Sequence, residues 1–260
     1  MHTFSKKMVL PIGDDNRDRR TTPVVNYLLI ALNIFAFIYW QKWGNNVGIT
    51  FSYAAVPGEI LTGHDVVTGT KVLIDPVTHQ RFELPGLGIT PIPVFFTLFT
   101  SMFMHGGLSH LGGNMLFLFV FGDNVEDAMG HVKYLIFYLL CGLLAGLCHV
   151  FSTLFLGQNL LVPSLGASGA ISAVLAAYVR LFPGKRVHLW IFLFIVPVPA
   201  FIAVGLWFAF QLVNGLGMLG GEEAGGVAYA AHIGGFIFGL LLTSMFAKGY
   251  LSRRRSYQRR

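Results

Sequence analysis

The feature that most limits how this chain can fold is a series of long apolar runs. A helix needs about 20 mainly apolar residues to cross a bilayer of about 30 Å. Charged residues make up only 12% of the 260 residues, whereas soluble domains carry roughly 25%. The composition therefore predicts a polytopic membrane protein whose compact part is an all-α bundle. The runs cover roughly 24–43, 94–122, 132–157, 164–182, 195–218 and 227–247.

Each run is expected to supply one transmembrane helix, which gives six spans. The first run is longer than the apolar core of a signal peptide, about 7–15 residues, so it is interpreted as a retained helix. The second run is interrupted by the glycines after His105, and its spanning part is expected to begin near Leu108. Residues 187–196 are predicted to be an interfacial lead-in before Pro197.

The expected domain organisation follows from these runs. The membrane domain covers 24–247 and is flanked by basic tails at 1–23 and 248–260. A long external loop at 44–93 is rich in proline, and its segment KVLIDPVTHQRFEL is typical of a short hairpin around Asp75-Pro76. Long structured loops are often functional or interfacial.

The basic residues predict how the chain is oriented. With six spans, both tails lie on the same side as the loops after the second and fourth helices. Of the 18 Lys and Arg residues, all but Lys42, Lys71 and Arg81 fall on that side. The positive-inside rule then predicts cytoplasmic termini, in the inner membrane of a bacterial cell. The net charge of +6 reflects topology and attraction to anionic lipid, and it is not the footprint of a nucleic-acid partner.

The motif Gly166-Ala167-Ser168-Gly169-Ala170 opens one apolar run, and a second small-residue motif around His232 opens another. Small residues let two helices approach closely, and a serine needs such proximity to meet a base. Gly235 and Gly239 share a helix face with His232. We therefore expect Ser168 to be a nucleophile and His232 its general base. Since the outer halves of the spans hold no carboxylate, the prediction is a dyad.

His110 and Asn114 lie near the start of the second predicted span, four residues apart on one helix face. Both side chains can donate hydrogen bonds, which suits an oxyanion site completed by the backbone N–H of Ser168. Gly166, Gly169, Gly235 and Gly239 are expected to support the close helix contact. All of these groups lie near the starts of spans that run in one direction, so they are expected to converge at one depth.

Each motif also has a structural interpretation. Taken alone, the serine motif is more often a helix-packing device, and the His232 motif resembles a packing seam. His110 and Asn114 could simply tie helices together. Cys141 and Cys148 would be about 10 Å apart on one helix, too far for a disulfide. No metal site is expected, because His64 and His79 lack metal-ligand spacing.

Taken together, the motifs resemble the rhomboid family of intramembrane serine proteases over about 94–247. The family pattern H-x-x-x-N corresponds to His110 and Asn114, G-x-S-G to the Ser168 motif, and A-H-x-x-G-x-x-x-G to the His232 motif. The segment from Thr100 to Gly107 is also similar to the family, and so is its G-x-x-x-E pattern, read here from Gly122 to Glu126.

Two positions depart from the family's pattern. Many members have a Trp-Arg pair in the first loop, where this chain reads Phe96-Thr97. Many also have an aromatic residue one turn after the nucleophile, where this chain has Ser172. The first difference concerns how the loop is anchored, and the second concerns the surface on which the base packs.

The resemblance implies an endopeptidase that cuts transmembrane-helix substrates near their outer end, without metal, nucleotide or other cofactor. Its expected partners are single-pass or polytopic membrane proteins and the surrounding lipid. Substrate entry is expected beside 197–217, with the loop from Gly217 to Gly226 as a mobile cap. The alternative is a catalytically silent rhomboid-like protein that binds membrane clients. A small transporter is a third interpretation, but the spans lack the mid-membrane charges that would favour it.

Overall fold

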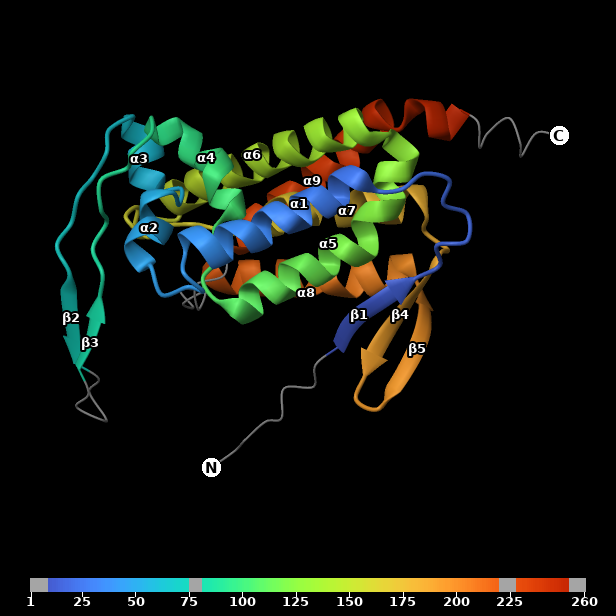
Figure 1. Cartoon of the computed structure of the whole chain (residues 1–260), viewed down its shortest axis with the longest axis horizontal. Coiled ribbons are helices and arrows are strands. Elements are labelled where there is room, and N and C mark those ends of the chain that lie inside the picture. The colour runs from blue at the N-terminus through green and yellow to red at the C-terminus, as the bar shows by residue number, and fades with distance from the viewer. Residues whose placement is uncertain (1–8, 75–80, 220–227, 253–260) are drawn as a thin grey trace.

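The computed structural model describes residues 9–74, 81–219 and 228–252, and it is dominated by a bundle of helices (Figure 1). Only Gly130 separates α5 from α6, whereas longer segments precede α5, α7 and α8. The main helices are α1 (Val24–Phe35), which continues as the π-helical turn η1 (Ala36–Trp40), α5 (Leu108–Met129), α6 (His131–Phe155), α7 (Ser168–Leu181), α8 (Ala200–Leu219) and α9 (Tyr229–Phe246).

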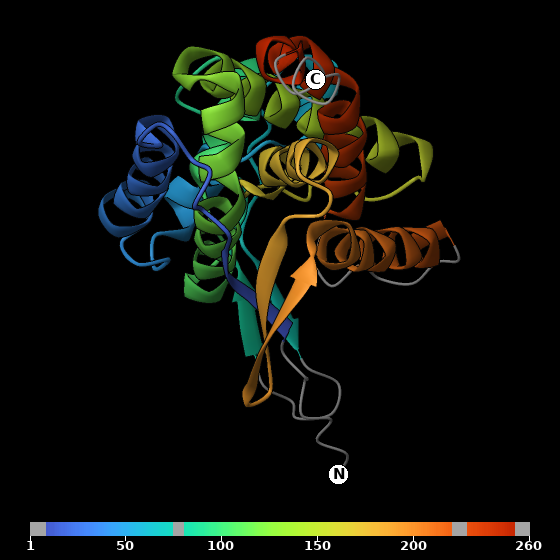
Figure 2. The same cartoon turned by 90° about the vertical axis from the view of Figure 1, so that its right-hand side faces the viewer.

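Helix α7 forms the centre of the bundle. Every residue from Gly169 to Tyr178 is buried, and the helix contacts α5, α6, α8 and α9. Seen end-on in Figure 2, α7 is surrounded by the other helices, whereas α8 lies at the outer edge beside α9. A 14-residue helix rich in alanine and serine can take this position because its small side chains let four neighbours approach its backbone.

Two helices, α6 and α9, are long and apolar enough on their own to cross a membrane. The segments Val24–Trp40, Ser168–Leu181 and Ala200–Leu216 are shorter apolar helices, and Val94–Phe103 is a shorter one still that precedes α5. Among the described residues, two of the six expected spans thus meet this criterion on their own.

The long loop after η1 is structured. It contains α2 (Val47–Ser52), α3 (Pro57–Thr62) and a hairpin of β2 (Lys71–Ile74) and β3 (Arg81–Leu84), paired antiparallel. The predicted hairpin is thus confirmed in its strands, while its turn at 75–80 lies outside the described residues. The hairpin projects from the end of the bundle opposite the start of α1 (Figure 1).

Three short helical turns lead from the loop into α5, as expected for the interrupted second run. They are η2 (Val94–Phe96), α4 (Thr97–Thr100) and η3 (Ser101–Phe103). The chain then turns at the glycines after His105, and α5 begins at Leu108.

The all-α expectation is wrong in one region. Residues 187–196, expected to lead into the next span, belong to a β-hairpin directly before α8, made of β4 (Arg186–Ile191) and β5 (Phe194–Pro199). β4 also pairs antiparallel with β1 (Val9–Asp14), which lies in the segment expected to be only a tail. An apolar run rich in β-branched and aromatic residues fits a strand as well as a helix, and here the partner strand lies about 180 positions away.

The G-x-x-x-E pattern of α5 anchors the first helix. A Cβ added at Gly122 would lie 2.1 Å from Asn26 Oδ1, so only glycine fits beneath α1. The N-cap residue of α1, Pro23, provides no side-chain hydrogen bond. Instead the Glu126 carboxylate accepts the N–H groups of Val25 (3.0 Å) and Asn26 (2.7 Å). Glu126 therefore satisfies donors that a helix start leaves without partners.

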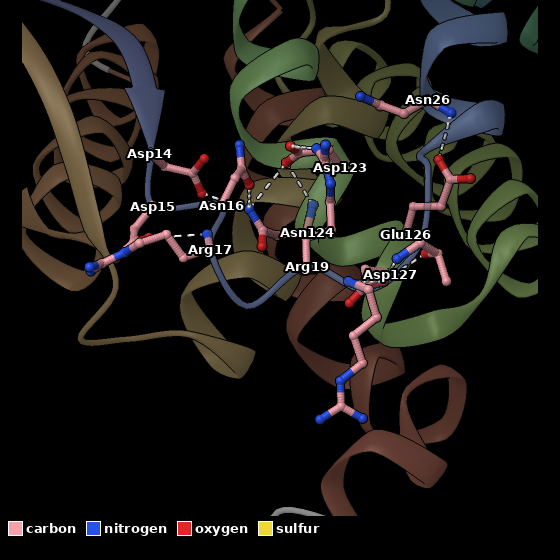
Figure 3. Close-up of polar contacts among 12 residues, drawn as sticks. Asp14, Asp15, Asn16, Arg17, Arg19, Asn26, Asp123, Asn124, Glu126 and Asp127 are labelled. Carbon is pink, nitrogen blue, oxygen red and sulfur yellow. Dashed lines mark hydrogen bonds and ion pairs between the residues drawn. The ribbon is translucent and has the colours of Figure 1, made fainter.

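The residues around Glu126 extend this network to the N-terminal segment, as Figure 3 shows. Asp123 forms a 2.5 Å ion pair with Arg19, and Asp127 accepts the backbone N–H of Thr21 at 2.7 Å. Asn124 donates to Asp14 at 2.8 Å, which connects α5 to the end of β1. The end of α5 thus fixes α1 and the small sheet at the end of the bundle where the chain enters it.

Candidate active site

Ser168 is the first residue of α7, and the backbone before it requires glycine. Gly166 has φ +119°, a region that residues with a Cβ rarely adopt. A Cβ at Gly166 would also lie 2.8 Å from the imidazole of His110. The chain therefore turns sharply into α7 directly against α5, which places the Ser168 hydroxyl at the start of the central helix.

His232 lies in the first turn of α9 and reaches Ser168. Its Nε2 is 2.7 Å from Ser168 Oγ, within the range of a good hydrogen bond. The imidazole is buried, with 9% of the residue exposed. The two residues are 64 positions apart in sequence, so only the packing of α7 against α9 brings them together.

Glycines make that packing possible. A Cβ at Gly235 would lie 2.1 Å from the carbonyl oxygen of Gly169, and one at Gly239 would lie 2.5 Å from Ala173 Cα. A Cβ at Gly169 would lie 2.8 Å from Ala145 Cβ of α6 and 3.8 Å from Ala231 Cβ of α9, so α6 packs closely at the same place. Because the backbones of α7 and α9 are in contact, the relative position of Ser168 and His232 is set by main chain rather than by long side chains.

His110 and Asn114 lie on the α5 face next to the Ser168 turn. A Cβ at Gly166 would be 2.8 Å from His110 Nε2 and 3.7 Å from Asn114 Nδ2. Asn114 is 8% exposed, and its Nδ2 has no hydrogen-bond partner among the described residues. A buried donor without a partner is costly. This one lies next to the Gly166 turn that leads into Ser168.

The loop before α5 is anchored by a residue that sequence reasoning did not identify. The buried side chain of Gln41, just after η1, donates from Nε2 to the carbonyl of His105 at 2.7 Å and accepts its N–H at 3.0 Å. Gln41 Nε2 also lies 2.9 Å from Thr50 Oγ1. A side-chain amide can mimic a backbone partner in this way, and here it holds the loop before α5 in place.

The surface on which His232 packs comes from α8. Ser172 does not reach it, because its hydroxyl donates back to the carbonyl of Ser168 at 2.7 Å. Instead the Trp207 ring lies 6.1 Å from the imidazole, centroid to centroid, and Tyr229 stands edge-on at 6.4 Å. The aromatic residues beside the base are thus supplied by α8 and α9 and not by α7.

Gln211 of α8 is a further residue that sequence reasoning did not identify. Gln211 Oε1 lies 2.7 Å from His232 Nδ1, and both groups are buried. The sequence did contain a signal, since polar side chains inside a membrane helix are costly and tend to be functional. Apart from the Trp207 ring N–H, Gln211 and Asn214 carry the only polar side-chain groups between Ala200 and Leu216.

Within the described residues, His, Cys, Asp and Glu side chains do not gather in groups of three or more that could hold a metal ion. His64 is exposed and lies 2.8 Å from the carbonyl of Thr62, whereas His79 is outside the described residues. The predicted cap, Gly217 to Gly226, also falls largely in the undescribed part, although α8 continues as far as Leu219.

Comparisons with known proteins give the family. A model of the Rhomboid domain matches residues 93–249. The chain is 33% identical over 155 residues to Rhomboid protein 1, mitochondrial, of Saccharomyces cerevisiae, covering 59% of this chain and 42% of that protein. It is 32% identical over 210 residues to the human Presenilin-associated rhomboid-like protein, mitochondrial, covering 77% and 50%. It is 30% identical over 159 residues to Rhomboid-like protein 11, chloroplastic, of Arabidopsis thaliana, covering 60% and 54%.

These comparisons correct the expected location. The chain spans about half the length of the curated relatives that it matches, and those relatives are proteins of mitochondria or chloroplasts. The expectation of a bacterial inner membrane with cytoplasmic termini is therefore overturned. The physical reason is that an asymmetry of basic residues reports which loops share a side of a membrane, and it does not report which membrane that is. The domain match covers more than half of the sequence, and the chain belongs to the rhomboid family.

Proposed function

We propose that this protein is an intramembrane serine endopeptidase in which Ser168 is the nucleophile and His232 the general base. The observation that carries the proposal is the 2.7 Å contact between Ser168 Oγ and His232 Nε2. A serine hydroxyl is a weak nucleophile until an adjacent base accepts its proton. Membership of a family whose members are generally intramembrane serine proteases adds independent support.

The proposed reaction begins when Ser168 Oγ attacks the carbonyl carbon of a substrate peptide bond while His232 Nε2 takes the hydroxyl proton. The C–N bond then breaks, and His232 returns that proton to the leaving amine. This leaves the substrate's acyl group esterified to Ser168. A water molecule, deprotonated by His232, hydrolyses the ester and restores the serine.

The negative charge that forms on the carbonyl oxygen needs donors nearby. Asn114 Nδ2, His110 and the backbone N–H of Ser168 are the proposed set, because both side chains lie on the α5 face that packs against the Gly166 turn. The unpartnered state of Asn114 Nδ2 in the described structure supports this role. Donors fixed before the reaction stabilise the transition state without having to reorganise.

The membrane arrangement is part of the proposal. We infer six spans within 24–247, formed by α1 with η1, α5, α6, α7, α8 and α9, with 44–93 as an external loop and 1–23 and 248–260 as tails. Support comes from large apolar side chains that stand exposed on the outer helices, such as Phe155 (82%) and Leu206 (67%), where lipid would cover them. The proposed substrates are membrane proteins whose transmembrane helix unwinds near the active site, since a helical backbone is otherwise fully hydrogen-bonded.

A cleavage assay in proteoliposomes tests this function. The protein and its Ser168→Ala variant are each reconstituted with a panel of single-span substrates that carry glycine or proline near one end of the span. We expect the wild type alone to release fragments, and mass spectrometry should locate the cut near the end of the span on the side opposite the tails. A panel that binds the wild type without being cut by it would instead support the client-binding alternative.

A further inference from the structure

The imidazole of His232 is held at both ring nitrogens. Nε2 faces Ser168 Oγ at 2.7 Å, and Nδ1 faces Gln211 Oε1, also at 2.7 Å. Gln211 is 6% exposed. The side chain therefore bridges from α8 to the base across the interior of the bundle, not across its surface.

The chemistry of an amide oxygen determines what this contact does. Gln211 Oε1 can only accept, so Nδ1 must carry the hydrogen. In a neutral imidazole the other nitrogen is then left with a lone pair, and that lone pair points at the Ser168 hydroxyl. The contact thus selects the tautomer in which His232 can act as a base. A neutral amide achieves this without adding a charge to the site.

Gln211 belongs to the helix at the edge of the bundle (Figure 2). The inner face of α8 is held by aromatic contacts, chiefly a Phe208–Phe236 stack with ring centroids 4.1 Å apart. Its outer face is exposed, including Phe210 at 59% and Val213 at 68%. Any movement of α8 away from α9 would carry the Gln211 acceptor with it, while Ser168 and His232 would stay on α7 and α9.

We propose that Gln211 is a positioning residue for His232, so that the base is correctly set only while α8 is packed against α9. This inference rests on the proposed protease function and deepens it. Helix α8, which is expected to border substrate entry, then also holds His232 in the tautomer that can act as a base. A substrate that displaces α8 on entering is not cut until the helix returns and the amide again accepts from Nδ1.

Three variants separate this role from a general effect on folding. Gln211→Met keeps the length of the side chain and removes the acceptor, whereas Gln211→Glu keeps an acceptor at the same position. Asn214→Met is the matched control, because it removes an amide from the same helix whose Nδ2 donates only to the carbonyl of Phe210. Thermal melting of each variant in detergent checks that it is folded.

The readouts are the second-order rate of labelling of Ser168 by a fluorophosphonate and the kcat and KM for a cleaved single-span substrate. We expect Gln211→Met to lower the labelling rate and kcat by about 2- to 13-fold, the effect of one net hydrogen bond, with KM unchanged. Gln211→Glu should restore most of the rate, and Asn214→Met should match the wild type. Phe208→Ala, which loosens α8, should slow labelling in the wild-type background and have no further effect in Gln211→Met.

The outcomes distinguish this inference from the function on which it rests. If wild-type Ser168 is labelled in a His232-dependent way and Gln211→Met is labelled equally fast, the inference is wrong and the protease proposal stands. A slowed Gln211→Met that Gln211→Glu does not rescue would also overturn it, because the loss would then come from packing. A wild type that is never labelled would remove both.

Discussion

The most informative perturbation is a single methyl group between α7 and α9. Gly235→Ala would place a Cβ 2.1 Å from the Gly169 carbonyl oxygen, whereas ordinary contact begins at 3.4 Å. The helices must therefore separate by about 1.3 Å at this point, because backbone atoms cannot move aside as a flexible side chain can. His232 is three residues away on the same face of α9, so its distance from Ser168 Oγ would grow from 2.7 Å toward about 4 Å, beyond a hydrogen bond.

The expected result is a large loss of activity with a moderate loss of stability. General-base assistance contributes about 10²–10⁴-fold to rate, whereas overpacking costs about 1–3 kcal/mol of stability. Labelling of Ser168 by a fluorophosphonate and thermal melting measure the two effects on the same sample. Gly205→Ala is the control, since a Cβ there meets nothing within 4 Å. Gly235→Ala labelled at the wild-type rate while folded would refute the claim that backbone contact sets the dyad geometry.

The remaining predictions address the oxyanion site and the tail-side network. Asn114→Ala should lower kcat about 10²–10³-fold while labelling still depends on His232, and an unchanged kcat would remove Asn114 from the oxyanion site. Burial raises the pKa of Asp14 from 3.8 to about 6, so the folded state binds the carboxyl proton more tightly than the unfolded state. The stabilisation of the folded state by this proton is complete below pH 3.8 and is lost as the pH rises through 6. Melting temperature against pH should therefore fall more steeply over this range in the wild type than in Asp14→Asn, and parallel curves would contradict the assignment. Glu126→Gln should lower the free energy of unfolding by about 1.5–3 kcal/mol, measured by denaturant titration in detergent. The reason is that a neutral amide offers one acceptor oxygen, whereas the carboxylate accepts from both Val25 and Asn26. Equal stability would show that another group caps α1.

The helical part of the fold could be predicted because it depends on local sequence. Apolar runs of membrane length locate the helices, and small residues at helical spacing identify the faces of α7 and α9 that touch. Ser168 and His232 each open such a run, so their meeting could be expected before any coordinates. Their catalytic roles, and those of His110 and Asn114, stay predictions.

The parts that escaped prediction depend on distant partners. The run containing Trp190 and Phe194 becomes a hairpin because β1, near the start of the chain, pairs with β4. No local period distinguishes that outcome from a helix. Gln41 and Gln211 act through single amide groups whose partners are 64 and 21 positions away. A lone glutamine has no spacing pattern, so only its cost within an apolar segment could have drawn attention to it.

The measurement that tests the central claim most directly is the mapping of a serine-directed fluorophosphonate adduct by mass spectrometry in the detergent-solubilised protein. The wild type is compared with Ser168→Ala and His232→Ala, each shown to be folded by thermal melting. An adduct on Ser168 that is absent from both variants is the predicted result, because it requires a serine activated by that histidine. A folded wild type whose pocket admits the probe but forms no adduct on Ser168 would contradict the account.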